Sequence, residues 1–214
     1  MVVRIIGDVV GSRGVEDRLG LHQRLSRVLA EANDRWDADL RITVGDEYQG
    51  TVASLGAAVA VTLAVRVALL PDHDVRHGLG RGPATVLDHD RAIEDGPGWW
   101  AARAAIEAVA DLEASAVTRT ARTAYRSVGS DDPAGDPAGD PAAPAVEAAL
   151  LARDELVGRL DARSLSVLRG LLGGRSQREL AEEAGVSASA VSQRVRRDGI
   201  GVVVTMSRWM ELLP

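Results

Sequence analysis

The chain has 214 residues, no cysteine, and a net charge of −6 that arises from 25 basic and 31 acidic residues. The absence of cysteine excludes disulfides and thiolate chemistry, and the longest apolar stretch, near Leu55–Leu70, is interrupted by Arg66 and is too short to span a bilayer. The composition, with 46% hydrophobic and 26% charged residues, is ordinary for a soluble globular protein. We therefore expect a cytoplasmic protein that does not enter a membrane.

The first predicted elements are a strand over residues 2–6 and a helix over residues 16–33. The strand is apolar and β-branched, and glycines follow it at Gly7, Gly11 and Gly14, so a glycine-rich turn is expected. The helix is indicated by leucines and valines that recur at helical spacing. Glycines at a strand end leave the backbone free to approach a phosphate, and this feature makes Gly7, Gly11 and Ser12 candidate ligand-binding residues.

The next elements complete an alternating pattern. A strand at 40–44 and its hairpin partner at 48–52 flank a tight turn at Gly45 and Asp46. A helix at about 55–70, a glycine-bearing strand at 75–79 and a helix at 99–114 follow. The order strand, helix, strand, strand, helix, strand predicts an α+β fold with the ferredoxin-like (palm- or cyclase-like) βαββαβ pattern over residues 1–129.

The C-terminal part reads differently. Residues 130–144 repeat a DPAG unit with no large apolar side chain, which predicts a disordered linker. Helices are expected at 145–160, 162–172, 177–184 and 188–197, whereas residues 201–213 leave strand or helix open. We therefore predict three parts, namely a domain at 1–129, the linker, and an all-α helix-turn-helix domain at 145–214.

The helix-turn-helix pattern indicates DNA binding. Gly185 permits the turn, and Ser187 is expected to cap the second helix. Residues 151–214 carry 10 arginines against 8 acids, whereas residues 1–150 carry 15 against 23, so only the C-terminal part could attract a phosphate backbone. The residues expected to face DNA are Ser187, Ser189, Ser192, Gln193, Arg194, Arg196 and Arg197. A helical hairpin that serves only packing or protein contacts is the alternative.

Two Gly-Asp pairs form the second candidate site. Asp8 and Asp46 each follow a short apolar strand, and two such strand ends can converge on one ion. Carboxylates with phosphate oxygens and water suit Mg²⁺ or Mn²⁺. The alternative is that each aspartate only closes a turn or caps a helix. Glu47 is expected in the turn, and the four histidines, which lack ligand spacing, are expected on the surface.

Four ordered motifs resemble the SatD family. They are GDVVGSR at the start, VGDEYQG in the centre, the glycine-rich RHGLGRG, and DGPGWWAARAAIE. The resemblance covers most of residues 1–128 and implies little chemistry, although its members often carry a C-terminal helix-turn-helix. The C-terminal pattern, over roughly 160–198, is similar to the four-helix DNA-binding domain of LuxR-type regulators and of sigma-factor region four.

The N-terminal motifs also resemble, more distantly, class III nucleotide cyclases and the diguanylate cyclase palm. This resemblance implies that Asp8 and Asp46 bind metal, that Gly45 lies in the nucleotide site, and that Arg103 steadies phosphate charge. Two positions depart from the cyclase pattern, because Trp99 stands where asparagine is usual and Ile42 stands where a lysine reads the base. These losses argue against cyclase turnover. Trp99 and Trp100 are instead expected in the core or in an interface.

The sequence thus predicts a DNA-binding transcriptional regulator of the SatD type. Its N-terminal domain would sense a nucleotide with Mg²⁺ or Mn²⁺, and its partners would be double-stranded DNA and a second copy in a homodimer. The alternative is an enzyme of nucleotidyl or phosphoryl transfer with a cyclase-like fold, which the helix-turn-helix only localises. A pure interaction module is a third reading.

Overall fold

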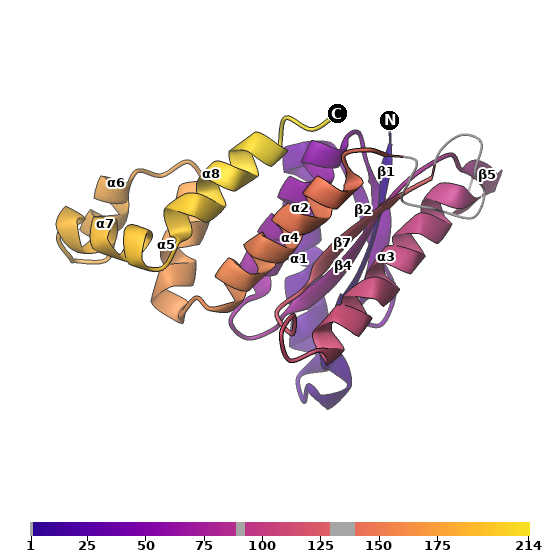
Figure 1. Cartoon of the computed structure of the whole chain (residues 1–214). Coiled ribbons are helices and arrows are strands. Elements are labelled where there is room, and N and C mark those ends of the chain that lie inside the picture. The colour runs from indigo at the N-terminus through magenta and orange to yellow at the C-terminus, as the bar shows by residue number, and fades with distance from the viewer. Residues whose placement is uncertain (1, 89–92, 129–139) are drawn as a thin grey trace.

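The computed structural model describes residues 2–88, 93–128 and 140–214 of the chain. It has a mixed α+β fold, which confirms that part of the prediction. A five-stranded sheet forms its centre, and helices cover both faces (Figure 1). The strands of this sheet are β1 (Val3–Val9), β2 (Asp39–Val44), β3 (Glu47–Val52), β4 (Val75–Arg81) and β7 (Thr123–Ser127).

The strand order in the sheet is β2-β3-β1-β4-β7. Strand β1 pairs antiparallel with both β3 and β4, so Gly7 lies opposite Tyr48 on one side and Asp8 lies opposite Arg76 on the other. Strand β7 pairs parallel to β4. A separate two-stranded ribbon consists of β5 (Thr85–Asp88) and β6 (Ile93–Asp95). The central position of β1 brings its end between two neighbouring strands.

Helix α3 (Pro97–Ala114) covers one face of the sheet, and α1 (Arg18–Trp36), α2 (Leu55–Leu69) and α4 (Ala143–Gly158) cover the other (Figure 1). Alternate residues of β1 serve the two faces. Ile5 and Val9 belong to the main core with α1 and α2, whereas Ile6 packs against Ala102 and Ile106 of α3.

Two glycines let α3 lie directly on strand β4. A Cβ at Gly78 would stand 2.2 Å from the carbonyl oxygen of Ala102, and one at Gly80 would stand 2.2 Å from that of Gly98. No side chain fits in that space. The glycine-rich strand is therefore explained by helix packing.

The C-terminal helices share the core of the sheet domain. Helix α4 begins at Ala143, two residues before the predicted helix, and its Ala143, Val146 and Leu150 lie in the main core with Met210 of α8. The predicted separate helix-turn-helix domain is therefore not confirmed. The rest of the predicted linker at 130–144 falls mostly outside the described residues.

The remaining helices are α5 (Ala162–Leu172), α6 (Gln177–Glu183), α7 (Ala188–Arg197) and α8 (Ile200–Met210). A short 3₁₀ turn, η1 (Ser12–Gly14), lies near the start of the chain. The segment 201–213 was left open between strand and helix. Residues 200–210 are helical, because Ile200, Val203 and Val204 pack at helical spacing into one core cluster. The backbone after α8 returns to the sheet domain, where Leu55 and Gly56 donate hydrogen bonds to Pro214 and Leu213. Among the described helices, none is long and apolar enough to cross a membrane.

Candidate functional site

A small cavity opens where the end of β1 meets helix α3. Its volume is about 140 Å³. Strands β1, β3 and β4 and helix α3 each contribute charged side chains to it, against an apolar wall that Ile6 and Ile106 form. The charged residues are Asp8, Glu47, Arg76, Arg103 and Glu107. We call this group the charged cavity.

The pleat of the sheet explains why these residues meet. Asp8 is two positions after Ile6, so both point to the α3 face. Tyr48 on β3 is buried in the core of the opposite face, and its neighbour Glu47 therefore points to the α3 side. The antiparallel pairing of β1 with β3 then sets Glu47 beside Asp8 in the same cavity.

Asp8 is held by an arginine from the neighbouring strand. Arg76 donates from Nε to Oδ1 and from Nη2 to Oδ2 of Asp8, with both distances at 3.0 Å. Its third nitrogen, Nη1, lies 3.4 Å from the Glu113 carboxylate on α3. This two-point pairing is geometrically specific. Arg103 and Glu47 form no ion pair with another described residue, so their charges are directed to the cavity and to solvent.

Asp46 lies on the other side of the hairpin. Gly45, with a φ of 66°, turns the chain, and the Asp46 carboxylate lies 3.8 Å from the Arg18 guanidinium of α1. It lines a different cavity, of about 260 Å³, with Leu19 and His22. Asp8 and Asp46 thus line different cavities, because Asp8 lies near the end of β1 on the α3 face, whereas Asp46 lies in the β2–β3 turn beside α1.

Of the residues expected to bind a cofactor, only Arg103 lines the charged cavity. A side chain at Gly7 would stand 2.3 Å from the Tyr48 ring, so this glycine makes room for core packing. Gly11 takes a left-handed conformation and begins the turn η1, in which Ser12 is buried. Gly45 serves the hairpin turn.

Sequence reasoning missed Glu47 and Arg76. Glu47 was expected in the turn, but it is the first residue of β3 and its side chain faces the cavity. The alternation from buried Tyr48 could have indicated its face. Arg76 lies on a predicted strand, and only the pairing of that strand with β1 reveals that it meets Asp8.

Trp99 and Trp100 differ in their surroundings. Trp99 packs against the apolar group of Ile6, Ala102 and Ile106, and its indole Nε1 donates to Glu94. It also lines a cavity of about 190 Å³ farther along the same face, between β2, β3 and the β5–β6 ribbon. Trp100 is exposed, and its Nε1 donates to Asp95.

His77 is fully buried, so the expected surface role is wrong for this histidine. It lies in β4, and its Nε2 meets the Tyr48 hydroxyl on β3. Burial, followed by the positive charges of Arg153 and Arg66, lowers the pKa of His77 to about 3. Burial also raises the pKa of Tyr48 well above its usual value. Both side chains are therefore neutral at physiological pH.

A chain of ion pairs joins the charged cavity to the C-terminal helices. Arg76 pairs with Glu113, Glu113 pairs with Arg122 at 3.3 Å, and Arg122 pairs with Asp74 at 2.8 Å. Arg66 of α2 continues the chain, because it pairs with Asp74 at 2.8 Å and with the fully buried Asp154 of α4 at 3.0 Å. Burial would raise the pKa of Asp74, but the two arginines lower it overall.

The residues expected to face DNA lie on and around α7. Ser187 caps this helix as predicted, by accepting a hydrogen bond from the Ala190 amide. Arg194 turns inward, where it donates to Ser164 at 2.8 Å and pairs with Asp161 at 3.2 Å. Arg197 pairs with Asp198. The exposed members of the set are Ser187, Ser189, Gln193, Arg196 and Arg197, whereas Ser192 is half-buried.

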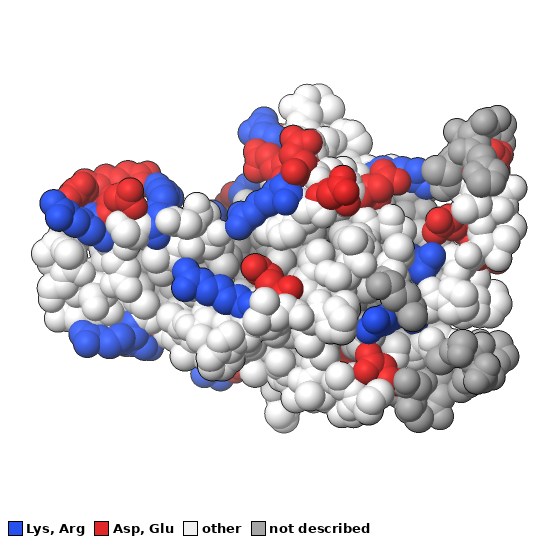
Figure 2. Space-filling view, turned by 90° about the horizontal axis from the view of Figure 1, so that it is seen from above, with Lys and Arg blue, Asp and Glu red and all other residues white. Residues whose placement is uncertain are grey.

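The arginines of α6 and of the turn before it are also paired with acids. Arg178 meets Glu182, and Arg175 meets Glu183. Figure 2 shows one face, where red and blue groups lie side by side along one edge of the end that these helices form, and a separate blue group lies at the other edge. Exposed pairs contribute little to stability, yet here they reduce the positive field that would attract a phosphate backbone.

Comparison with known proteins identifies the N-terminal part. The model of the SatD family matches residues 2–134, which confirms the resemblance that the four motifs predicted. A comparison with curated proteins finds no match.

Three solved structures that resemble the chain are cyclase domains. The catalytic core of a rhodopsin-guanylyl cyclase with converted specificity, in complex with ATPalphaS, is 22% identical over 50% of this chain and 71% of that one, with a TM-score of 0.40. The guanylate cyclase domain of RhGC from Catenaria anguillulae, in complex with GTP, is 21% identical over 39% of this chain and 57% of that one, with a TM-score of 0.34. The non-canonical dimeric guanylyl cyclase domain from Blastocladiella emersonii is 18% identical over 50% of this chain and 72% of that one, with a TM-score of 0.41. At these values no activity is transferred to this chain.

These findings correct the predicted function. The prediction of a DNA-binding transcriptional regulator is wrong, because the family match lies on the α+β part and not on the predicted helix-turn-helix. The structure agrees with this correction. The C-terminal helices are packed into the sheet domain, and most of their arginines pair with neighbouring acids.

Proposed function

The chain belongs to the SatD family, and we propose that its α+β part binds a nucleoside triphosphate together with Mg²⁺ or Mn²⁺ and serves phosphoryl or nucleotidyl transfer. The observation that carries this proposal is the charged cavity, in which Asp8 and Glu47 face the same space as Arg76 and Arg103. Carboxylates and guanidinium groups in one cavity suit a cation and the phosphates that it accompanies.

The donor set fits the cation. Mg²⁺ in phosphate sites is commonly held by one or two carboxylates, with phosphate oxygens and water as the other ligands. Asp8 and Glu47 offer such a pair, and no group of three or more metal-binding side chains occurs among the described residues. When bound, the cation would neutralise phosphate charge and polarise the phosphoryl group under attack.

The arginines would hold the phosphates. Arg103 has no ionic partner among the described residues, and its position on α3 directs it to the cavity. Arg76 would change partners, because a cation on Asp8 repels the guanidinium that now occupies both carboxylate oxygens. Glu113 would then keep Arg76 at the cavity rim. The volume of about 140 Å³ suits phosphate and cation, so the nucleoside would extend outside.

The strand order supports a ferredoxin-like, palm-like unit. Strands β2, β3, β1 and β4 form a four-stranded antiparallel set that two crossover helices connect. In this arrangement the end of β1 and the β2–β3 hairpin lie side by side, as the distant cyclase resemblance implies. The chemistry would nevertheless differ from cyclisation, since Ile42 packs against the main core and Trp99 packs against Ile6.

A homodimer is part of the proposal. The β5–β6 ribbon exposes Val86, Leu87 and Ile93, and Trp100 beside it is half exposed. A two-stranded ribbon is marginally stable alone, and a second copy could cover these side chains. Analytical ultracentrifugation of the chain and of Leu87→Glu tests this point, because the substitution should yield a monomer.

The test of the proposed function is calorimetric titration with ATP and GTP, each with and without Mn²⁺. Binding should require Mn²⁺ and should be lost in Asp8→Asn and in Glu47→Gln. The matched control is Asp46→Asn, one residue away on the opposite face, which should bind as the parent chain does. Loss of binding in Asp46→Asn with retention in Glu47→Gln would contradict the proposed site.

A further inference from the structure

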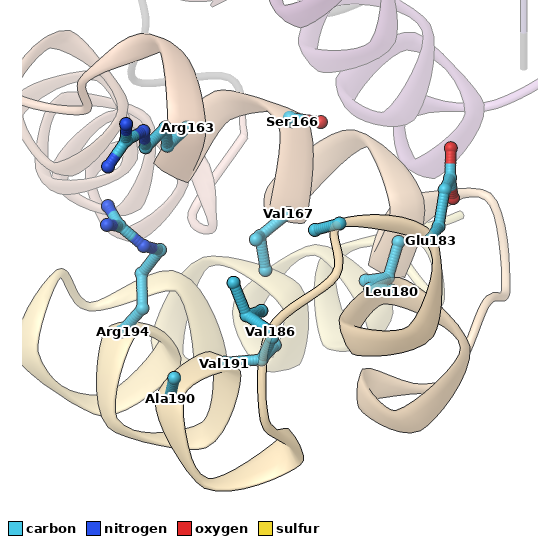
Figure 3. A pocket seen from close by; sticks show the side chains of 10 residues that line it. Arg163, Ser166, Val167, Leu180, Glu183, Val186, Ala190, Val191 and Arg194 are labelled. Atoms are coloured by element: carbon cyan, nitrogen blue, oxygen red, sulfur yellow. The ribbon is translucent and has the colours of Figure 1, made fainter.

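The largest cavity described here lies among the C-terminal helices and is separate from the charged cavity. It has a volume of about 510 Å³, opens to solvent, and is lined by residues of α5, α6 and α7 and of the turn between α6 and α7. Figure 3 shows its lining side chains converging from these three helices and from the turn between α6 and α7. The volume lies in the range of small-molecule sites, roughly 300–1,000 Å³.

The floor of this cavity is apolar. Val167 of α5, Leu180 of α6 and Val191 of α7 line it, and the last two are buried. Val186, in the turn between α6 and α7, is 48% exposed at its rim. Apolar surface that water can reach is stabilised when a ligand covers it.

One end of the cavity is cationic. Arg163 of α5 and Arg194 of α7 both line it, and in Figure 3 their guanidinium groups lie at the same end, whereas Glu183 lies at the other. Arg194 is fixed there by Asp161 and Ser164. Arg163 forms no ion pair with another described residue. Two guanidinium groups at one end, with only one of them neutralised, leave a positive charge next to an apolar floor.

We propose that this cavity binds a small amphipathic anion, with a carboxylate or similar acidic head and an apolar body. The head would accept hydrogen bonds from Arg163 and from the free nitrogens of Arg194, and the body would cover Val167, Leu180 and Val191. Charge complementarity selects the anionic head. The far end of the lining carries no basic side chain, and Glu183 there is already paired with Arg175, so a monoanion is the expected ligand class. This site is independent of the proposed nucleotide site.

The test uses the full chain and the fluorescent amphipathic anion 1-anilinonaphthalene-8-sulfonate. Its emission should rise on binding, and octanoate should displace it whereas octylamine should not. Arg163→Gln should weaken binding about tenfold, as expected for one charge-assisted hydrogen bond. Ala190→Trp, at an exposed position of the lining, should fill the cavity and abolish binding. The control Arg196→Gln removes the same charge from an exposed position outside the lining and should change nothing.

Three results would overturn the proposal. One is an affinity for the dye that Arg163→Gln and Ala190→Trp leave unchanged, and another is equal displacement by octylamine and octanoate. The third is displacement only by an acidic amphipathic helical peptide, which would identify the cavity as a protein-docking groove. Circular dichroism checks that each variant is folded. If Ala190→Trp does not fold, the affinity of Arg163→Gln for the dye tests the proposal by itself.

Discussion

Arg76 grips both carboxylate oxygens of Asp8, each at 3.0 Å, across the pair of neighbouring strands β1 and β4. The same guanidinium also contacts Glu113 on α3. The charge of Asp8 is thus neutralised by Arg76, and Arg76 has Glu113 as a second carboxylate partner. The strength of this pair sets how readily a cation reaches Asp8.

Removal of the arginine should therefore raise the affinity for Mn²⁺. In Arg76→Gln the Asp8 carboxylate is free, and we expect about tenfold tighter Mn²⁺ binding, equivalent to roughly 1.4 kcal/mol. Glu113→Gln should weaken binding, because Arg76 then has Asp8 as its main partner. Electron paramagnetic resonance of free Mn²⁺ measures both effects. Equal Mn²⁺ affinity in the parent and both variants would show that the pair does not control the cation.

Incubation with ATP or GTP and Mn²⁺ should yield no cyclic nucleotide. The base-reading position is Ile42, which packs against the main core, and the usual asparagine position is Trp99, which packs against α3 residues and Ile6. Chromatographic separation of the nucleotides measures the product. Cyclic product that disappears in Asp8→Asn would instead establish cyclase turnover at the charged cavity.

Acid should destabilise the fold through His77. The pKa of this residue is about 3 in the folded chain and near 6.5 in the unfolded chain, so below pH 6.5 the unfolded state binds the additional proton. Stability is full above pH 6.5 and falls as the pH decreases toward 3. At pH 5.5 the loss is about 1.4 kcal/mol. The groups around His77 are Tyr48 on β3, Arg66 on α2, Arg153 on α4 and Asp74 at the start of β4.

Urea unfolding at pH 7.5 and pH 5.5 measures this loss. The control is His77→Gln, in which the difference between the two pH values should shrink, although the variant itself is less stable. Asp74 does not interfere, since its lowered pKa places its titration below this range. An equal pH dependence in both chains would assign the effect to other groups.

Gly80→Ala should destabilise the fold by about 1–3 kcal/mol, the usual cost of overpacking. The added Cβ would stand 2.2 Å from the carbonyl oxygen of Gly98 in α3, which is backbone and cannot rotate away. Gly14→Ala is the control, because a Cβ there meets nothing within 4 Å, and it should lie within about 0.5 kcal/mol of the parent. Thermal and urea unfolding measure both.

A chain that ends at residue 128 should not fold stably. Truncation removes α4 and α8, whose Ala143, Val146, Leu150 and Met210 complete the main core. It also removes Asp154, one of the two carboxylates that pair with buried Arg66, so that only Asp74 remains as its partner. Circular dichroism and proteolysis of the truncated chain measure the outcome. A cooperative melt close to that of the full chain would show that residues 2–128 are an independent domain.

The sequence by itself determined the local elements and the family. Strands β1 to β4 and helices α1 to α3 followed from hydrophobic periodicity, although β5, β6 and β7 were not predicted. The cap at Ser187 followed from residue type, and four ordered motifs indicated the SatD family. These signals are local, because periodicity, capping and turn chemistry depend on residues within a few positions of one another.

Only the tertiary structure decided which residues meet. Asp8 and Asp46 looked equivalent in sequence, but the pleat and the hairpin turn place them in different cavities, whereas Glu47 and Arg76 join Asp8. Register and face depend on pairing between strands that are far apart in the chain, which a single sequence does not specify. The same reason explains His77, whose burial follows from the cover that α2 and α4 provide, and Arg194 of α7, whose partner Asp161 directly precedes α5.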